Sequence, residues 1–128
     1  MNFNKEEYKF RLKKVQKSMQ DKGIELLISH DTANMNYLTG YDAWSFYYAQ
    51  AVIVHVNAEE PLCWVRKQDS GGAYIKTYLK HDNILVYDEK YIHTWPLHPY
   101  DNLVEIIKKR KWDKLTIGLE MDSHYFTA

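Results

Sequence analysis

The sequence is poor in the features that mark a secreted, membrane-bound or nucleic-acid-binding protein. Its single cysteine, Cys63, cannot form an internal disulfide, which is typical of proteins in a reducing compartment. Its 17 lysines and arginines balance 17 aspartates and glutamates, so no net field draws nucleic acid or an anionic membrane. No apolar run approaches the roughly 20 residues of a membrane span, and the charged N-terminus differs from a signal peptide. We therefore expect a cytoplasmic domain without a nucleic-acid or membrane partner.

The sequence also lacks the standard signatures of a self-contained active site. There is no Gly-x-Ser-x-Gly elbow, no P-loop lysine and no dinucleotide-binding Gly-x-Gly-x-x-Gly. Gly71 and Gly72 are more simply explained by a tight turn than by phosphate binding. His93 and His98 match no metal-ligand spacing, and Cys63 is predicted to be buried in a strand and inert. We expect no catalytic residue, metal ligand or cofactor in this chain.

The 128 residues suit one domain and contain recognisable helix signals. Asn4 and Glu7 form a capping-box pair, and an apolar stripe of Tyr8, Leu12, Val15 and Met19 follows before Gly23 ends the helix. Asp31 or Thr32 begins a brief helix that Gly40 ends. Further helices are predicted at 69–79 and 101–111, and an ordered loop at 89–100.

Five apolar segments are predicted as strands, at 24–29, 51–56, 61–67, 83–88 and 114–120. The second and third form a hairpin, and His55 within the second is expected to be a hydrogen-bonded core histidine. Because strands alternate with helices, we expect an α/β fold. After the last strand, "MDSHYFTA" starts like a capped helix, so we expect a larger protein to continue beyond Ala128.

Carboxylates at strand ends offer one catalytic alternative. Asp88 and Glu89 follow one predicted strand, and Glu120 and Asp122 follow another. Such groups hold Mg²⁺ in nucleases, although acidic residues at strand ends and helix caps are also ordinary structural features. The basic run at 108–114 is better explained by the helix dipole, which favours cations at a C-terminus, than by nucleic-acid binding.

The stretch from Asn34 to Gln50, "NMNYLTGYDAWSFYYAQ", concentrates six aromatic residues. Tyr37 and Leu38 lie in the predicted short helix and are expected in the core. The rings after Gly40 are not explained by the local core. Some of them, such as Phe46 and Tyr48, could equally begin the next strand.

The order of these segments resembles the N-terminal domain of the creatinase/prolidase family of "pita-bread" hydrolases, which includes Xaa-Pro dipeptidases, creatinase and ectoine hydrolase. An amphipathic helix leads through "GIELLIS" to "NMNYLTGY", which matches the family pattern Asn-x-x-Tyr-Leu-Thr-Gly-Tyr/Phe, and "IGLE" closes the domain. The resemblance covers essentially the whole chain. It implies a ribonuclease-H-like topology, with a mixed sheet of five to six strands flanked by helices.

The resemblance also implies a function for the aromatic stretch. The family's catalytic domain, with its pair of divalent metals, is absent from these 128 residues, so the chain alone is expected to be inactive. In the family, the N-terminal domain supports a homodimer and covers the partner subunit's active site with a loop after "YLTG". Four residues are therefore the candidates for contacting a dipeptide or a small guanidino or amidine substrate: Asp42, Trp44, Phe46 and Tyr47. Among the activities of the family, we favour Xaa-Pro dipeptidase for the full-length protein. The alternative is that the chain is not part of an enzyme but a stand-alone dimerisation or interaction module.

Overall fold

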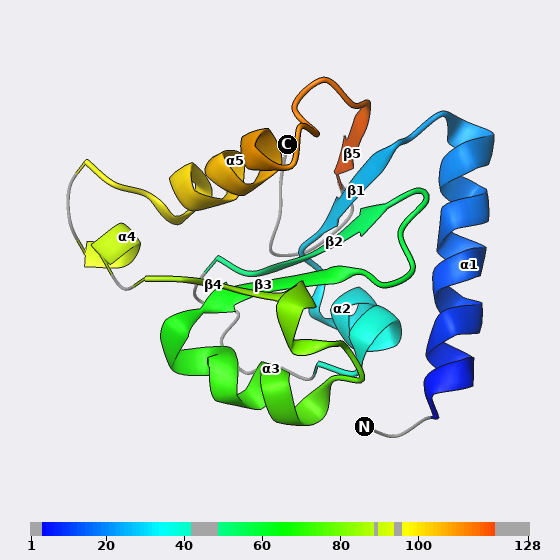
Figure 1. Cartoon of the computed structure of the whole chain (residues 1–128), viewed down its shortest axis with the longest axis horizontal. Helices are drawn as coiled ribbons and strands as arrows, with labels where there is room; N and C mark the ends of the chain where they lie inside the picture. The colour runs from blue at the N-terminus through cyan, green and yellow to red at the C-terminus, as the bar shows by residue number, and fades with distance from the viewer. Residues whose placement is uncertain (1–3, 42–48, 89, 94–95, 120–128) are drawn as a thin grey trace.

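The computed structural model describes residues 4–41, 49–88, 90–93 and 96–119, which form a mixed sheet between two layers of helices (Figure 1). The strands lie in the order β4-β3-β2-β1-β5, and β2 alone is antiparallel to its neighbours. This confirms the predicted α/β class with a mixed sheet flanked by helices. The helices are α1 (Lys5–Lys22), α2 (Thr32–Thr39), α3 (Ser70–Lys76), α4 (Lys90–His93) and α5 (Pro99–Lys109), with short 3₁₀ helices at Lys67–Asp69 and His81–Asn83. The strands are β1 (Leu26–Ser29), β2 (Ala51–His55), β3 (Leu62–Arg66), β4 (Ile84–Tyr87) and β5 (Ile117–Leu119).

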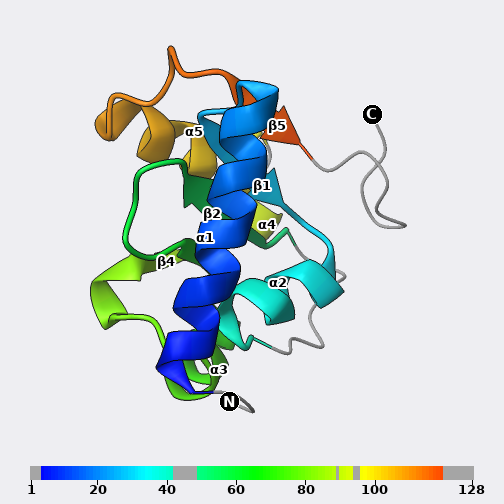
Figure 2. The same cartoon turned by 90° about the vertical axis from the view of Figure 1, so that its right-hand side faces the viewer.

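Helix α1 begins and ends where its local sequence predicts. The Asn4 side chain accepts the backbone N–H of Glu7 at 3.0 Å, and Gly23 ends the helix with φ of 71°. That left-handed conformation is accessible to glycine because it has no Cβ. Tyr8, Leu12 and Met19 are buried, so the predicted apolar stripe is the face that packs on the sheet. Figure 2 shows α1 crossing in front of the sheet.

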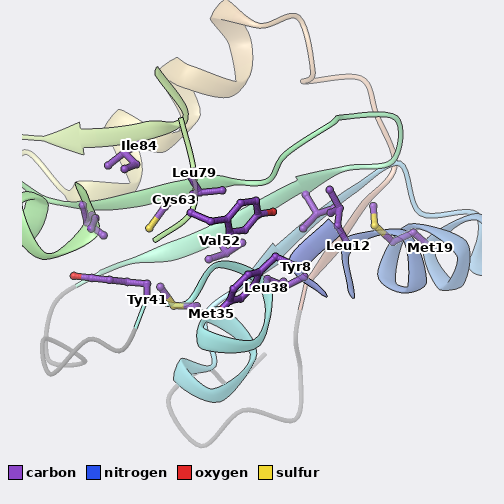
Figure 3. Packing of buried hydrophobic residues seen from close by; sticks show 14 residues of the cluster. Tyr8, Leu12, Met19, Met35, Leu38, Tyr41, Val52, Cys63, Leu79 and Ile84 are labelled. Carbon is purple, nitrogen blue, oxygen red and sulfur yellow. The ribbon is translucent and has the colours of Figure 1, made fainter. Parts of the chain in front are cut away.

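The two faces of the sheet are buried under different helices, as alternation along the strands requires. Val52, Val54, Cys63 and Val65 point toward α1, α2 and α3, where they join a core cluster that Figure 3 shows. The residues between them on β2 and β3 pack with Leu103 and Ile107 of α5 on the opposite face. Every residue of β2 except His55 is buried, which explains why this strand reads as continuously apolar.

Several local predictions are wrong. The segment expected as a loop contains α4, and α5 begins at Pro99, two residues early. His98 caps α5 by accepting the backbone N–H of Tyr100, and the preset φ of proline suits the first helical position. Gly71 and Gly72 lie within α3 and not in a tight turn. Tyr37 is 37% exposed, whereas Leu38 is buried as expected.

The sheet order places Asp88, which is the one carboxylate of the nuclease hypothesis that the structure describes, at the end of an edge strand. Asp88 follows β4 and the described part of β5 ends at Leu119, but these strands form opposite edges of the sheet. Four strand spacings of about 4.8 Å place the two strand ends roughly 19 Å apart. Glu89, Glu120 and Asp122 lie outside the described residues, so the nuclease hypothesis stays a prediction.

Within the part of the chain that the structure describes, no helix combines the length and apolar character needed to cross a membrane.

Candidate functional site

The aromatic stretch connects to the sheet at the edge where the parallel strands end. Strands β1, β3, β4 and β5 all run in one direction, and β2 runs against them. Ser29 at the end of β1 pairs with Val52 near the start of β2, so the residues just before β2 lie at the carboxyl ends of the other strands. In open α/β sheets, ligands bind outside this edge. We call it the carboxyl edge.

The predicted contact residues Asp42, Trp44, Phe46 and Tyr47 lie outside the described residues, within 42–48. The residues on either side of that segment are described. Their positions define where the segment leaves and rejoins the fold.

The residue directly before segment 42–48, Tyr41, is fixed in the core. Gly40 ends α2 with φ of 84°, and the Thr39 hydroxyl donates to the Met35 carbonyl at 2.7 Å while accepting the backbone N–H of Tyr41 at 3.1 Å. Tyr41 itself is only 4% exposed and joins the core cluster under α1–α3 (Figure 3). A Cβ added to Gly72 would lie 3.8 Å from the Tyr41 ring, so the ring packs against the start of α3.

The downstream end is held by Tyr87, at the end of β4. Its hydroxyl donates a hydrogen bond of 2.5 Å to the Ala49 carbonyl, two residues before β2. The Tyr87 ring is fully buried and lies 4.8 Å from the ring of Trp64 on β3. The Trp64 indole N–H in turn donates to Asn102 Oδ1 of α5 at 2.9 Å. A buried chain of contacts thus connects the downstream end to α5.

A polar contact that the sequence reasoning missed lies beside this anchor. His30, directly after β1, has Nε2 2.7 Å from the hydroxyl of Tyr100 in the first turn of α5. Burial raises the pKa of the Tyr100 hydroxyl, and its ring is 5.7 Å from that of Trp64. The position of His30 directly after a buried strand is a sequence signal for a role at this edge. Its partner Tyr100 lies 70 residues away, so no local sequence pattern predicts the contact. We call His30, Trp64, Tyr87, Tyr100 and Asn102 the edge cluster.

The histidine and cysteine side chains that the sequence singles out have structural surroundings where they are described. No group of three or more His, Cys, Asp or Glu side chains among them is placed to hold a metal ion. Cys63 is buried as predicted, and desolvation raises the pKa of its thiol to about 12, so it is protonated and unreactive at neutral pH. The ring of His98 is committed to capping α5. His55 is half-buried, and its Nδ1 accepts the backbone N–H of Asn57 at 3.1 Å.

Comparison with known proteins identifies sequence and structural relatives. Residues 11–128 match the sequence profile of the creatinase/prolidase N-terminal domain. The chain is 40% identical over 127 residues to the ectoine hydrolase of Halomonas elongata, covering 98% of this chain and 32% of that protein. It is 35% identical over 128 residues to an uncharacterised hydrolase/peptidase of Sinorhizobium fredii, covering 33% of that protein. The chain thus spans about a third of the length of the curated relatives it matches.

Solved structures share the fold. An Xaa-Pro aminopeptidase from Streptococcus pyogenes superposes with a TM-score of 0.68 at 17% identity, covering 95% of this chain and 80% of that chain. This likeness concerns the fold of the domain.

Proposed function

Because the chain belongs to the creatinase/prolidase N-terminal domain family, we propose that it is the non-catalytic domain of a larger hydrolase. The domain supports a homodimer, and its segment 42–48 covers the active site of the partner subunit. The reacting groups, and a pair of divalent metals if the reaction uses one, belong to a catalytic domain outside this chain. The location that we propose is cytoplasmic.

The observation that carries the proposal is the pair of anchors around segment 42–48. Tyr41 is buried on one face of the sheet, and the Ala49 carbonyl is held by Tyr87, which packs on the other face. Eight residue steps separate Tyr41 from Ala49, so the chain between them spans at most about 28 Å and projects up to about 14 Å from fixed ends. Fixed ends reduce the entropy cost of positioning a contact loop over a substrate.

The chemistry of the segment suits a small substrate with a cationic part. Trp44, Phe46 and Tyr47 provide rigid aromatic area, and a ring face attracts an ammonium, guanidinium or amidinium group. Asp42 supplies a carboxylate for the same cation. We propose hydrolysis of a C–N bond in such a compound. The similarity to an ectoine hydrolase supports a small amidine as the substrate. Xaa-Pro dipeptides are the other substrate class to assay.

The test measures kcat and KM of the full-length protein with Trp44→Ala and with Asp42→Asn, using a cyclic amidine and an Xaa-Pro dipeptide. We expect kcat/KM to fall with the true substrate, because each variant loses a substrate contact. Phe10→Ala is the control, since Phe10 is 58% exposed on α1. Unchanged kcat and KM in Trp44→Ala would show that the segment does not contact the substrate. A coding sequence that stops after Ala128 would instead favour an interaction module.

A further inference from the structure

A second feature lies at the opposite end of the sheet, where the β2–β3 hairpin turns. A groove of about 390 Å³ runs between α1 and this turn. Its lining includes four cationic residues, Lys5, Lys9, Lys13 and Lys80, and two anionic residues, Glu59 and Glu60. Its volume is in the range of small-molecule sites. Nothing in the proposed function uses this groove.

The groove is built by hydrogen bonds that do not involve the lysine ammonium groups. The Gln16 amide of α1 donates to the carbonyls of His55 at 3.0 Å and Ala58 at 2.8 Å, which fixes the helix against the turn. Glu60 Oε1 accepts the backbone N–H of Lys80 and the amide of Asn83, both at 2.9 Å. The Glu60 carboxylate is therefore engaged in holding the 80–83 segment, and the walls are formed without a ligand.

The three lysines of α1 are placed where the helix does not favour them. They are spaced four residues apart, so they share one face, and like charges at that spacing destabilise a helix. Lys5 is also in the first turn, where the helix dipole disfavours a cation. Among the residues that the structure describes, Lys9 meets Glu6 at 4.0 Å, and Lys5, Lys13 and Lys80 form no ion pair.

We propose that this groove binds a small ligand with two or more acid groups, either carboxylates or phosphates. The acid groups lie between the lysines of α1 and Lys80, and the positive end of the α1 dipole adds to the attraction. The bound anion offsets the repulsion among the three lysines. This site is independent of segment 42–48 and of the hydrolase activity.

The test is a titration of the ¹⁵N-labelled 128-residue chain, followed by amide chemical shifts. Citrate and pyrophosphate are the probes, since they separate carboxylate from phosphate recognition. We expect saturable shifts at residues 5–16, 58–60 and 80. The variant Lys9→Gln with Lys13→Gln should bind about tenfold more weakly, because two charge contacts are lost. Glutamine keeps the helix propensity of lysine, so α1 should remain folded.

The matched control is Lys14→Gln with Lys17→Gln, which removes the same charge from exposed positions of α1 outside the groove. It should leave the dissociation constant unchanged. Equal weakening by both double variants would mean diffuse charge attraction, and would overturn the proposal. Absence of saturable shifts with both probes at millimolar concentration would also overturn it.

Discussion

The hydroxyl of Tyr87 reaches across strand β3 to donate a hydrogen bond to the backbone carbonyl of Ala49. Tyr87 is on the edge strand β4, whereas Ala49 precedes β2, and β3 lies between these strands. One side chain therefore fixes the point where the aromatic segment returns to the sheet. This contact ties the buried core to the carboxyl edge.

The variant Tyr87→Phe tests this anchor. The ring remains packed against Trp64, but the Ala49 carbonyl loses its donor, so we expect a loss of about 1 kcal/mol in the free energy of unfolding. Amide exchange of the residues around Ala49 should become faster, as measured by NMR. Tyr74→Phe is the control, because Tyr74 is 38% exposed. Exchange near Ala49 that is as slow as in the unsubstituted protein would show that the hydrogen bond does not hold this end.

Gly23 and Gly40 both have a left-handed backbone conformation. Comparing their alanine variants separates the cost of backbone strain from the cost of a close contact. Gly23→Ala meets no atom within 4 Å, so its cost is that of the left-handed conformation, about 1–2 kcal/mol. Gly40→Ala incurs the same strain, and its Cβ would also lie 3.0 Å from the Tyr8 hydroxyl and 3.1 Å from the Lys76 carbonyl. Denaturant unfolding should show Gly40→Ala to be the more destabilised variant. Equal losses would mean that the close approach at Gly40 has no cost.

The hydrogen bond between Trp64 and Asn102 in the edge cluster can be tested by substitution. In Asn102→Ala, the indole N–H of Trp64 loses its acceptor in a half-buried position, which should cost about 1–3 kcal/mol. In the background Trp64→Phe, which has no N–H, the same substitution should cost less. A double-mutant cycle from chemical denaturation measures the difference. Additive effects would show that the hydrogen bond makes no net contribution to stability.

Cys63 predicts a stability loss at alkaline pH. Burial raises the pKa of its thiol from an ordinary 9.0 to about 12. Between these values the unfolded chain releases the proton while the folded protein retains it, so stability is full below about pH 9 and falls as pH rises. Unfolding free energies measured from pH 7 to 10 under reducing conditions should fall more steeply in the unsubstituted protein than in Cys63→Ala. Burial also raises the pKa of the Tyr78 and Tyr100 hydroxyls, but these tyrosines are present in both proteins. Parallel pH profiles would therefore contradict the assigned cause.

The parts of the fold that depend on neighbouring residues could be predicted from the sequence. Asn4, Gly23, Asp31 and Gly40 act on backbone groups a few positions away, so they identify where helices begin and end. The beginning of α5 was misplaced because histidine is an unusual cap. Pro99 directly after His98 was the overlooked signal.

Side-chain roles that depend on distant residues were harder to predict. The prediction that Tyr37 lies in the core is wrong, because its side chain is partly exposed. The guanidinium carbon of Arg11 from α1 lies over the Tyr37 ring, 4.6 Å from the ring centroid. An eight-residue helix has too few turns for its pattern to assign each ring to a face. The contact between His30 and Tyr100 depends on how α5 returns across the sheet, which no local pattern specifies.

The most direct measurement of the central claim is complementation between two variants of the full-length protein. One subunit carries Asp42→Ala and Trp44→Ala with an intact catalytic domain, and the other carries an intact segment 42–48 with an inactivated catalytic domain. If the segment serves the partner's active site, activity absent from each homodimer should reappear in mixed dimers, because one site then has both parts. Mixed dimers that remain inactive would contradict the account.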